Sequence, residues 1–260
     1  MTETPETLDF IEGIDIDLPP GLEAVGGVEN DPISIIPPNF FAGTEKTIVV
    51  GSQLAAFAAS VDEAMRPHIS NMFLLAQLAA DKHIENTGGD SRSWYDFYVK
   101  TLKGMGWLVE GDANAVREVE GATLQVHQEI IPVITAALGP MAAAASTITT
   151  VLNGLANINK DAPWITLFHR KSQRAKANQF QISYATAEGG HPALTLVGFE
   201  LEAETEVTQV LFFKFGASSA SLKHFEVKIS MAAATVDLIK DAIARKLGLL
   251  ITQNIEDIEI

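Results

Sequence analysis

The stretch 130–159 contains no charged side chain, although 20% of the residues in the chain are charged. A stretch of this kind belongs either in the buried interior of a fold or in a membrane. A membrane-spanning helix needs about twenty predominantly apolar residues, but Pro132, Gly139, Pro140 and several threonines dilute the apolar residues here. We therefore predict a buried layer of the fold, with conditional insertion into a membrane as the alternative.

Proline and glycine divide this stretch into two helices. Proline is tolerated in the first turn of a helix, and glycine commonly follows the last helical residue. Pro132 thus predicts the first turn of a short helix that ends at Leu138. Pro140 predicts the start of a longer helix that reaches about Ala156.

Residues 1–45 differ in composition from the rest of the chain. They contain ten carboxylates and no lysine or arginine, so they carry most of the formal net charge of −15. They also contain six of the eleven prolines, and proline denies hydrogen bonds to helices and sheets. We predict an extended acidic arm, 1–45, that wraps around a single domain, 46–260. The excess of acid disfavours binding to nucleic acid.

Helical spacing of apolar residues dominates the first half of that domain. It predicts one helix over residues 54–84, which Pro67 should kink or split near Arg66. A second helix should start at Ser93, with Asp96 completing its cap. A short strand at 107–110 and an irregular or strand-like segment at 116–128 follow.

From residue 180 onward apolar residues alternate with polar ones, which is typical of half-buried strands. Four such segments, joined by short turns, predict an antiparallel meander with one face buried; they are 180–184, 194–201, 207–215 and 225–229. A helix over 232–247 and an edge strand near the end complete the chain. The predicted fold is α+β, with a four- to five-stranded antiparallel meander sheet packed against about five helices.

The sequence offers little for common catalytic or cofactor chemistry. It has no cysteine, which excludes disulfides, thiolate catalysis and thioester lipidation. The six histidines show no metal-binding spacing, and no phosphate- or dinucleotide-binding glycine motif occurs. Glu200, Glu202, Glu204 and Glu206 alternate along a predicted strand, which we interpret as a solvent-facing edge rather than a metal site. We predict no metal and no cofactor.

Two groups of residues are candidates for binding. The first is an apolar wall for a hydrophobic ligand, suggested by aromatic crowding at 94–107 and by the charge-free stretch: Trp94, Phe97, Tyr98, Trp107, Ile148 and Leu152. Core packing is the simpler interpretation of these residues, because helical spacing explains most of them. The second is a basic run that could meet an anionic partner: Arg170, Lys171, Arg174 and Lys176. A solvated connection before the sheet is the simpler interpretation of that run.

The order of these parts resembles the Evf-type bacterial virulence factors. The segments that carry the resemblance are SWYDFYVKTLKGMGW, 93–107, and ALTLVGFELEAETEVTQVLFFKF, 193–215. The resemblance implies helices around an antiparallel sheet and an association with a fatty-acyl chain, which is covalently attached in the founding member. This chain has no cysteine to carry a thioester, so only a non-covalent acyl ligand would remain.

We therefore predict a non-enzymatic, virulence-type interaction factor. Its partner would be a fatty acid, a membrane lipid or another protein, bound through the apolar helical layer. The alternative is a hydrolase whose site is assembled from distant residues, since such sites leave no local motif. No positively charged segment followed by an apolar run opens the chain, so we expect a cytoplasmic protein or one exported without a Sec-type signal. The sequence does not indicate an oligomeric state.

Overall fold

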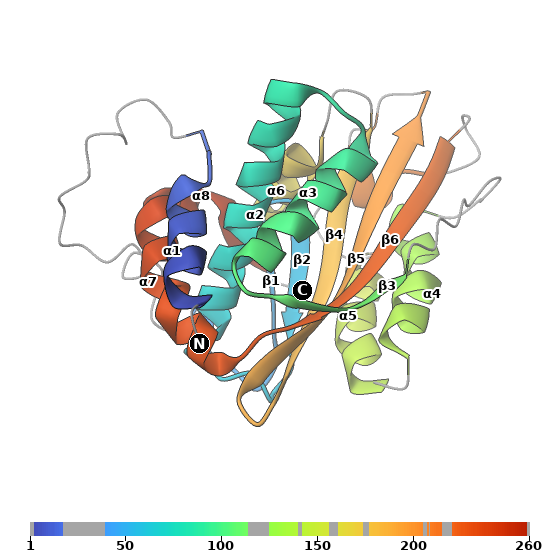
Figure 1. Cartoon of the computed structure of the whole chain (residues 1–260). Coiled ribbons are helices and arrows are strands. Elements are labelled where there is room, and N and C mark those ends of the chain that lie inside the picture. Colours follow the sequence, from blue (N-terminus) through green and yellow to red (C-terminus); the bar gives the residue numbers. More distant parts are fainter. Residues whose placement is uncertain are drawn as a thin grey trace.

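Two layers of helices enclose a central β-sheet in the computed structural model (Figure 1). The structure describes residues 3–17, 40–113, 125–139, 142–155, 161–173, 177–204, 207, 209–214 and 220–258. The α+β class predicted from the sequence is confirmed.

The sheet has seven strands in the order β3-β6-β5-β4-β2-β1-β7. The strands are β1 Lys46–Val50, β2 Gln53–Phe57, β3 Leu108–Ala113, β4 Asn178–Glu188, β5 His191–Ala203, β6 Ala220–Ser230 and β7 Ile255–Asp257. The segments β4, β5 and β6 form the predicted meander, and β7 is the predicted edge strand. The prediction of four to five antiparallel strands is nevertheless wrong, because β2 runs parallel to β4 and joins a second group of strands to the meander.

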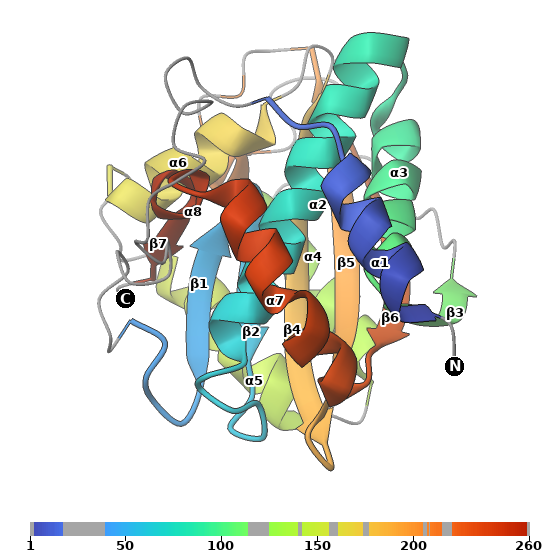
Figure 2. The ribbon, with the colours of Figure 1, turned by 60° about the vertical axis from the view of Figure 1, so that its left-hand side comes forward.

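Eight α-helices lie in the described ranges, against about five predicted. They are α1 Glu3–Gly13, α2 Arg66–Thr87, α3 Ser91–Gly104, α4 Val126–Leu138, α5 Ala142–Gly154, α6 Pro163–Ser172, α7 Ala233–Leu247 and α8 Leu250–Asn254. One layer contains α1, α2, α3, α7 and α8, and the other contains α4, α5, α6 and the short 3₁₀ helix η3, Val210–Phe212 (Figures 1 and 2). Both faces of the sheet are therefore buried, whereas the sequence predicted only one.

The two faces of the central strand β4 differ in chemistry. Phe180, Ile182 and Tyr184 point into the apolar cluster beneath α4, α5 and α6. The residues between them, Gln181 and Ser183, point toward α2 and α3 and are 0% and 1% exposed. A strand alternates its side chains between two faces, so β4 presents one apolar and one polar face, both of them buried.

Hydrogen bonds reach the polar face of β4 from two sides, although Gln181 Nε2 has no hydrogen-bond partner within the described residues. From α2, the Gln77 side-chain carbonyl accepts the Ser52 backbone N–H, 2.9 Å, and the Ser52 hydroxyl donates to Gln181 Oε1, 3.1 Å. From α3, the Tyr98 hydroxyl donates to Gln53 Oε1, 2.9 Å, and Gln53 Nε2 donates to Ser183 Oγ, 2.8 Å. We call these six residues the polar seam. It fixes the register of the helices α2 and α3 on the sheet.

A glycine admits the Gln77 side chain to this seam. Gly51 lies in the turn between β1 and β2 with φ +57°, and a Cβ there would lie 2.5 Å from Gln77 Oε1. Both the positive φ and the close approach require glycine at this turn.

The first predicted helix begins in the wrong place. Residues 53–57 form the strand β2, and α2 starts at Arg66 with Pro67 in its first turn, so that no kink arises. A strand buried on both faces is apolar at nearly every position, and it cannot be distinguished from a helix by spacing alone. Pro67 marks the helix start, where proline lacks no needed hydrogen bond.

Three further boundaries also differ from prediction. Asp90, not Ser93, caps α3, because its carboxylate accepts the Ser93 backbone N–H at 2.9 Å. Of the predicted strand 207–215, residues 210–212 form η3 and residues 208 and 215 lie outside the described ranges. Helix α4 starts at Val126, inside the segment predicted as irregular, so Pro132 lies in the middle of the helix rather than in its first turn.

The predicted extended arm contains a helix, α1, which corrects the expectation of no regular structure in residues 1–45. Pro5 falls in the first turn of α1, where proline is tolerated. Residues 1–2 and 18–39 of the predicted arm lie outside the described residues, so the wrapping of the arm around the body stays a prediction.

Removing one hydroxyl from the polar seam tests its contribution to stability. Tyr98→Phe should lower the free energy of unfolding by about 1–2 kcal/mol, because Gln53 Oε1 loses a buried hydrogen-bond donor. Urea unfolding followed by circular dichroism measures the change. Tyr184→Phe removes the same atom from the apolar face of β4 and is the matched control. An equal loss in both variants would contradict a special role for the seam.

Candidate functional site

The charge-free stretch forms the helical hairpin α4–α5, which covers the apolar face of the sheet (Figure 1). The predicted division into two helices is confirmed, and Gly139, with φ +60°, ends the first of them. The second helix is not the longer one, because each has thirteen residues. Helix α4 contacts β5 and η3, and α5 packs on α4. The buried side chains of the hairpin are Ile130, Val133, Ile134, Ala137, Leu138, Ile148, Val151, Leu152 and Leu155.

The outer face of the hairpin is also uncharged from Ile130 onward, whereas the first turn of α4 carries the half-buried Glu129. The exposed residues from Ile130 onward in the described ranges are Pro132, Thr135, Ala136, Gly139, Ser146, Thr150 and Asn153. Soluble helices usually place charged residues on the side that faces water. Here a carboxylate comes instead from outside the hairpin, since the Thr147 hydroxyl donates to Glu45 Oε2 at 2.5 Å. From Ile130 onward, the described side chains of the hairpin are thus small polar or apolar groups.

A buried histidine attaches this layer to the neighbouring segment. His127, 2% exposed, lies in the first turn of α4, with Nδ1 2.7 Å from the Leu211 carbonyl oxygen and its ring against Phe212. Burial lowers the pKa of His127 below its ordinary value of 6.5, and the hydrogen bond to Leu211 opposes that shift. Burial also lowers the pKa of His169 on α6. Both histidines belong to the layer of α4, α5 and α6.

The hairpin helices are short. In the part of the chain that the structure describes, no helix combines the length and the apolar character needed to cross a membrane.

The six predicted wall residues do not line one surface. Trp94, Tyr98 and Trp107 are buried in the cluster beneath α2 and α3, and Phe97 packs against it. Ile148 and Leu152 lie in the cluster on the opposite face of the sheet. The single wall is therefore wrong as geometry, because the sheet separates its two halves. Ligand binding by either half stays a prediction.

The predicted basic run begins in the last turn of α6 rather than in a solvated connection. Arg170 is exposed and Lys171 is half-buried there, where cations interact favourably with the carboxyl end of a helix. Arg174 and Lys176 lie outside the described residues. Binding of an anionic partner to this run stays a prediction.

The predicted glutamate edge is also different in the structure. Glu200 lies on β5, a central strand, and is 6% exposed. Its carboxylate accepts from Lys223 Nζ at 3.1 Å, directly across on β6. Cross-strand pairing, rather than a solvent-facing edge, explains this residue. Within the described residues, no cluster of three or more histidine, aspartate or glutamate side chains is arranged to hold a metal ion.

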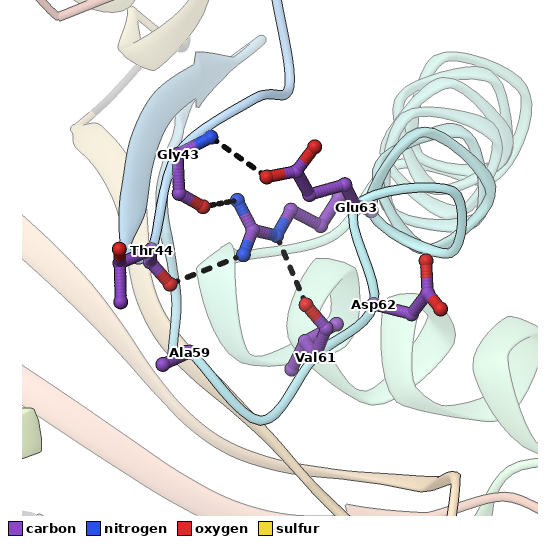
Figure 3. Close-up of a pocket in the computed structure, with 7 residues that line it drawn as sticks. Gly43, Thr44, Ala59, Val61, Asp62 and Glu63 are labelled. Carbon is purple, nitrogen blue, oxygen red and sulfur yellow. Dashed lines mark hydrogen bonds between the residues drawn. The ribbon is translucent and has the colours of Figure 1, made fainter.

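A polar pocket that the sequence did not indicate lies at the start of α2 (Figure 3). It has a volume of about 340 Å³. At its base Arg66, 1% exposed, donates only to backbone carbonyls: Phe41 and Gly43 at 2.9 and 2.8 Å, and Thr44 and Val61 at 3.2 Å. The guanidinium thus fastens the segment before β1 to the amino end of α2.

Two carboxylates complete the pocket. Glu63 Oε1 accepts the Gly43 backbone N–H at 2.9 Å, and Asp62 Oδ1 accepts the Ala64 backbone N–H at 2.8 Å. Burial lowers the pKa of Arg66 below its usual value, and the charges of Glu63 and Asp62 oppose that shift. Because carbonyl oxygens already engage the guanidinium, the pocket acts as a structural clamp rather than as an anion site.

No protein-family model matches the sequence, and no curated protein matches it either. Solved structures resemble the chain in layout. A delta-endotoxin has a TM-score of 0.43 and 16% identity, with 74% of this chain and 90% of that chain covered. The activated Cyt2Ba monomer from Bacillus thuringiensis subsp. israelensis has a TM-score of 0.38 and 14% identity, with 68% of this chain and 96% of that chain covered. The Evf virulence factor has a TM-score of 0.33 and 11% identity, with 81% of this chain and 86% of that chain covered. The layout resemblance to Evf predicted from the sequence is confirmed, at this weak level.

Acid should destabilise the layer that holds His127. Its folded pKa lies below 6.5, so the unfolded chain binds a proton first as the pH falls. The contribution of neutral His127 to the stability of the fold is therefore fully present above the pKa of histidine in the unfolded chain. That contribution is lost as the pH falls from the unfolded pKa toward the folded pKa. His127→Gln, which retains a donor for the Leu211 carbonyl, should make stability less dependent on pH between about pH 7.5 and 5.5.

Urea midpoints across that range measure the effect, with His83→Gln on α2 as the control on the other layer. A wild-type dependence on pH that persists unchanged in His127→Gln would contradict the assignment to this residue.

The clamp at Arg66 predicts an arginine-specific loss of stability. Arg66→Lys keeps the charge but cannot reach all four carbonyls, so it should lower the free energy of unfolding by about 1–3 kcal/mol. Arg245→Lys, at an exposed position on α7, is the matched control and should cost less than about 0.5 kcal/mol. Urea unfolding of both variants checks the difference, and equal losses would contradict the clamp.

Proposed function

We propose that this chain is a non-enzymatic, virulence-type interaction factor that binds a lipid surface through the hairpin α4–α5. The observation that carries the proposal is the absence of any charged residue in the hairpin from Ile130 onward, after Glu129 in the first turn of α4. The virulence-type role is a hypothesis that rests on the sequence resemblance alone.

Charge is what makes a helix costly to bury in the hydrocarbon core of a membrane. Each lysine, arginine or aspartate at the centre of a membrane helix costs about 2.5–3.5 kcal/mol, whereas small and apolar residues cost much less. The described parts of α4 and α5 after Glu129 contain no such residue. They could therefore leave water at little electrostatic cost.

The length of the hairpin indicates how it would meet the lipid. Each helix has thirteen residues, which span about 20 Å at the usual helical rise, whereas a bilayer core is about 30 Å thick. A hairpin of this length would lie in the interface rather than cross the bilayer.

The face beneath the hairpin supports the same function. Phe180, Ile182, Val197, Phe199 and Leu201 form part of the apolar surface that the layer of α4, α5 and α6 covers. If that layer moved onto a lipid surface, the apolar side chains of the sheet beneath it would also come to face the lipid. No catalytic arrangement is needed for this activity.

A charge placed on the outer face of the hairpin tests the proposal. Thr150 is exposed on α5, so Thr150→Lys should fold normally and cut the protein fraction that floats with vesicles several-fold. The probe is a neutral phosphatidylcholine vesicle, so that added positive charge cannot improve binding by attraction to the headgroups.

The matched control is Leu238→Lys, which removes a large exposed apolar residue, 39% exposed, from α7 on the other layer. It should float as the wild-type chain does. Absence of wild-type flotation at every pH between about 7.5 and 5.5, or equal losses in the two variants, would overturn the proposal.

A further inference from the structure

The amino-terminal helix α1 lies across α7 and α3 on the side opposite to the hairpin (Figure 2). Residues 18–39, which join α1 to the rest of the chain, are not among those described. The described contacts therefore show α1 as a helix seated on a surface formed by α2, α3 and α7. We call this surface the α1 groove.

Two apolar side chains anchor α1 in the groove. Ile11 is 0% exposed and belongs to the core cluster beneath α2, α3 and α7. The Phe10 ring lies over Gly104, the last residue of α3, where any Cβ would overlap the ring. The glycine thus forms a recess for one aromatic side chain, as in other grooves that bind an amphipathic helix by a few anchors.

Two lysines of the groove meet the polar end of α1. Lys246 Nζ on α7 donates to the Glu12 backbone carbonyl at 2.9 Å and so satisfies a carbonyl at the carboxyl end of α1. Lys82 Nζ on α2 lies 2.6 Å from Asp17 Oδ1. The exposed side of α1 is acidic, with Glu6, Asp9 and Glu12 facing solvent. The groove therefore fits an amphipathic helix by shape, with the acidic side of that helix turned toward solvent.

A helix as short as α1 depends on such a surface. Isolated helices of fewer than about 12–15 residues are marginal in water, and α1 has eleven. Its folding is thus coupled to its docking, which makes α1 a ligand of the groove held on the same chain.

We propose that the α1 groove is a helix-binding site that accepts α1 of a second copy of this chain. Exchange between two copies keeps every contact described above, since the same residues meet in both arrangements, and swapping an element is a low-cost route to a dimer. Residues 18–39 can extend to about 75 Å at most, which permits the exchange. This proposal does not depend on lipid binding by the hairpin.

Peptide binding in trans tests the groove. The full chain with Ile11→Asp should vacate its groove, because a carboxylate cannot occupy the Ile11 site. A labelled peptide of residues 3–17 should then bind saturably in fluorescence anisotropy, and the same peptide with Ile11→Asp should not. Adding Gly104→Val to the chain fills the recess and should abolish binding.

Circular dichroism establishes that each chain variant is folded. If Ile11→Asp unfolds the chain, Phe10→Asp at the half-exposed anchor vacates the recess instead, and the same peptide titration applies. A folded, vacated chain that binds the peptide no better than the chain with the filled recess would overturn the helix-binding site.

The second copy is tested by mixing two full-length variants. Ile11→Asp has a groove but no competent α1, and Gly104→Val has α1 but no competent groove. Native mass spectrometry should show a 1:1 heterodimer in the mixture and monomers of each variant alone. Peptide binding without any heterodimer at the highest soluble concentration would overturn the second copy as the occupant.

Discussion

The buried polar face of β4 is the constraint on which the arrangement of the whole chain depends. Gln181 and Ser183 lie in the centre of a sheet covered on both sides, so their polar atoms need partners that water would otherwise supply. Helices α2 and α3 supply partners for Gln181 Oε1 and Ser183 Oγ through Gln77 and Tyr98, by way of Ser52 and Gln53, whereas Gln181 Nε2 has no hydrogen-bond partner among the described residues. The layer with α2 and α3 is therefore fixed in position by directed bonds, whereas the layer of α4, α5 and α6 meets the sheet mainly through apolar contacts. Apolar contacts are not directional, so of the two layers the second is the one that can move without leaving the polar seam unpaired.

Sequence patterns predicted the helices and strands that have one apolar and one polar face. They missed a strand that is buried on both faces. The alternation in β4 and the helical spacing in α7 gave correct elements, and Gly139 gave the correct division of the hairpin. Strand β2 was read as helix because Leu54, Ala55 and Phe57 are buried on two faces at once. The α1 helix was missed because prolines suggested an extended arm, although Pro5 sits where a helix tolerates it. The parallel pairing of β2 with β4 joins distant segments, and no local pattern reports such a pairing.

The candidate site could be predicted only in part, for a similar reason. Lack of charge marked the hairpin directly, because charge is a property of the sequence. The prediction of a single apolar wall is wrong because residue spacing identifies the apolar face of a helix but not the side of the sheet that the helix covers. Trp94 and Leu152 lie on opposite sides of the sheet. The Arg66 clamp was invisible because its partners are backbone carbonyls, which every residue has. The signal that could have found it is an arginine beside a proline at a helix start, which is too common to be specific. A hydrolase assembled from distant residues stays the alternative, and no contact described above favours it.

Hydrogen exchange of the wild-type chain with and without phosphatidylcholine vesicles tests the central claim most directly, because it reports which helices leave their positions. The account predicts that vesicles change the exchange of backbone amides in α4 and α5, while amides in α2 and α3, which the polar seam holds on the sheet, keep the exchange they show in solution. Unchanged exchange throughout α4 and α5 when the protein is bound to vesicles, or a change confined to α2 and α3, would contradict the account.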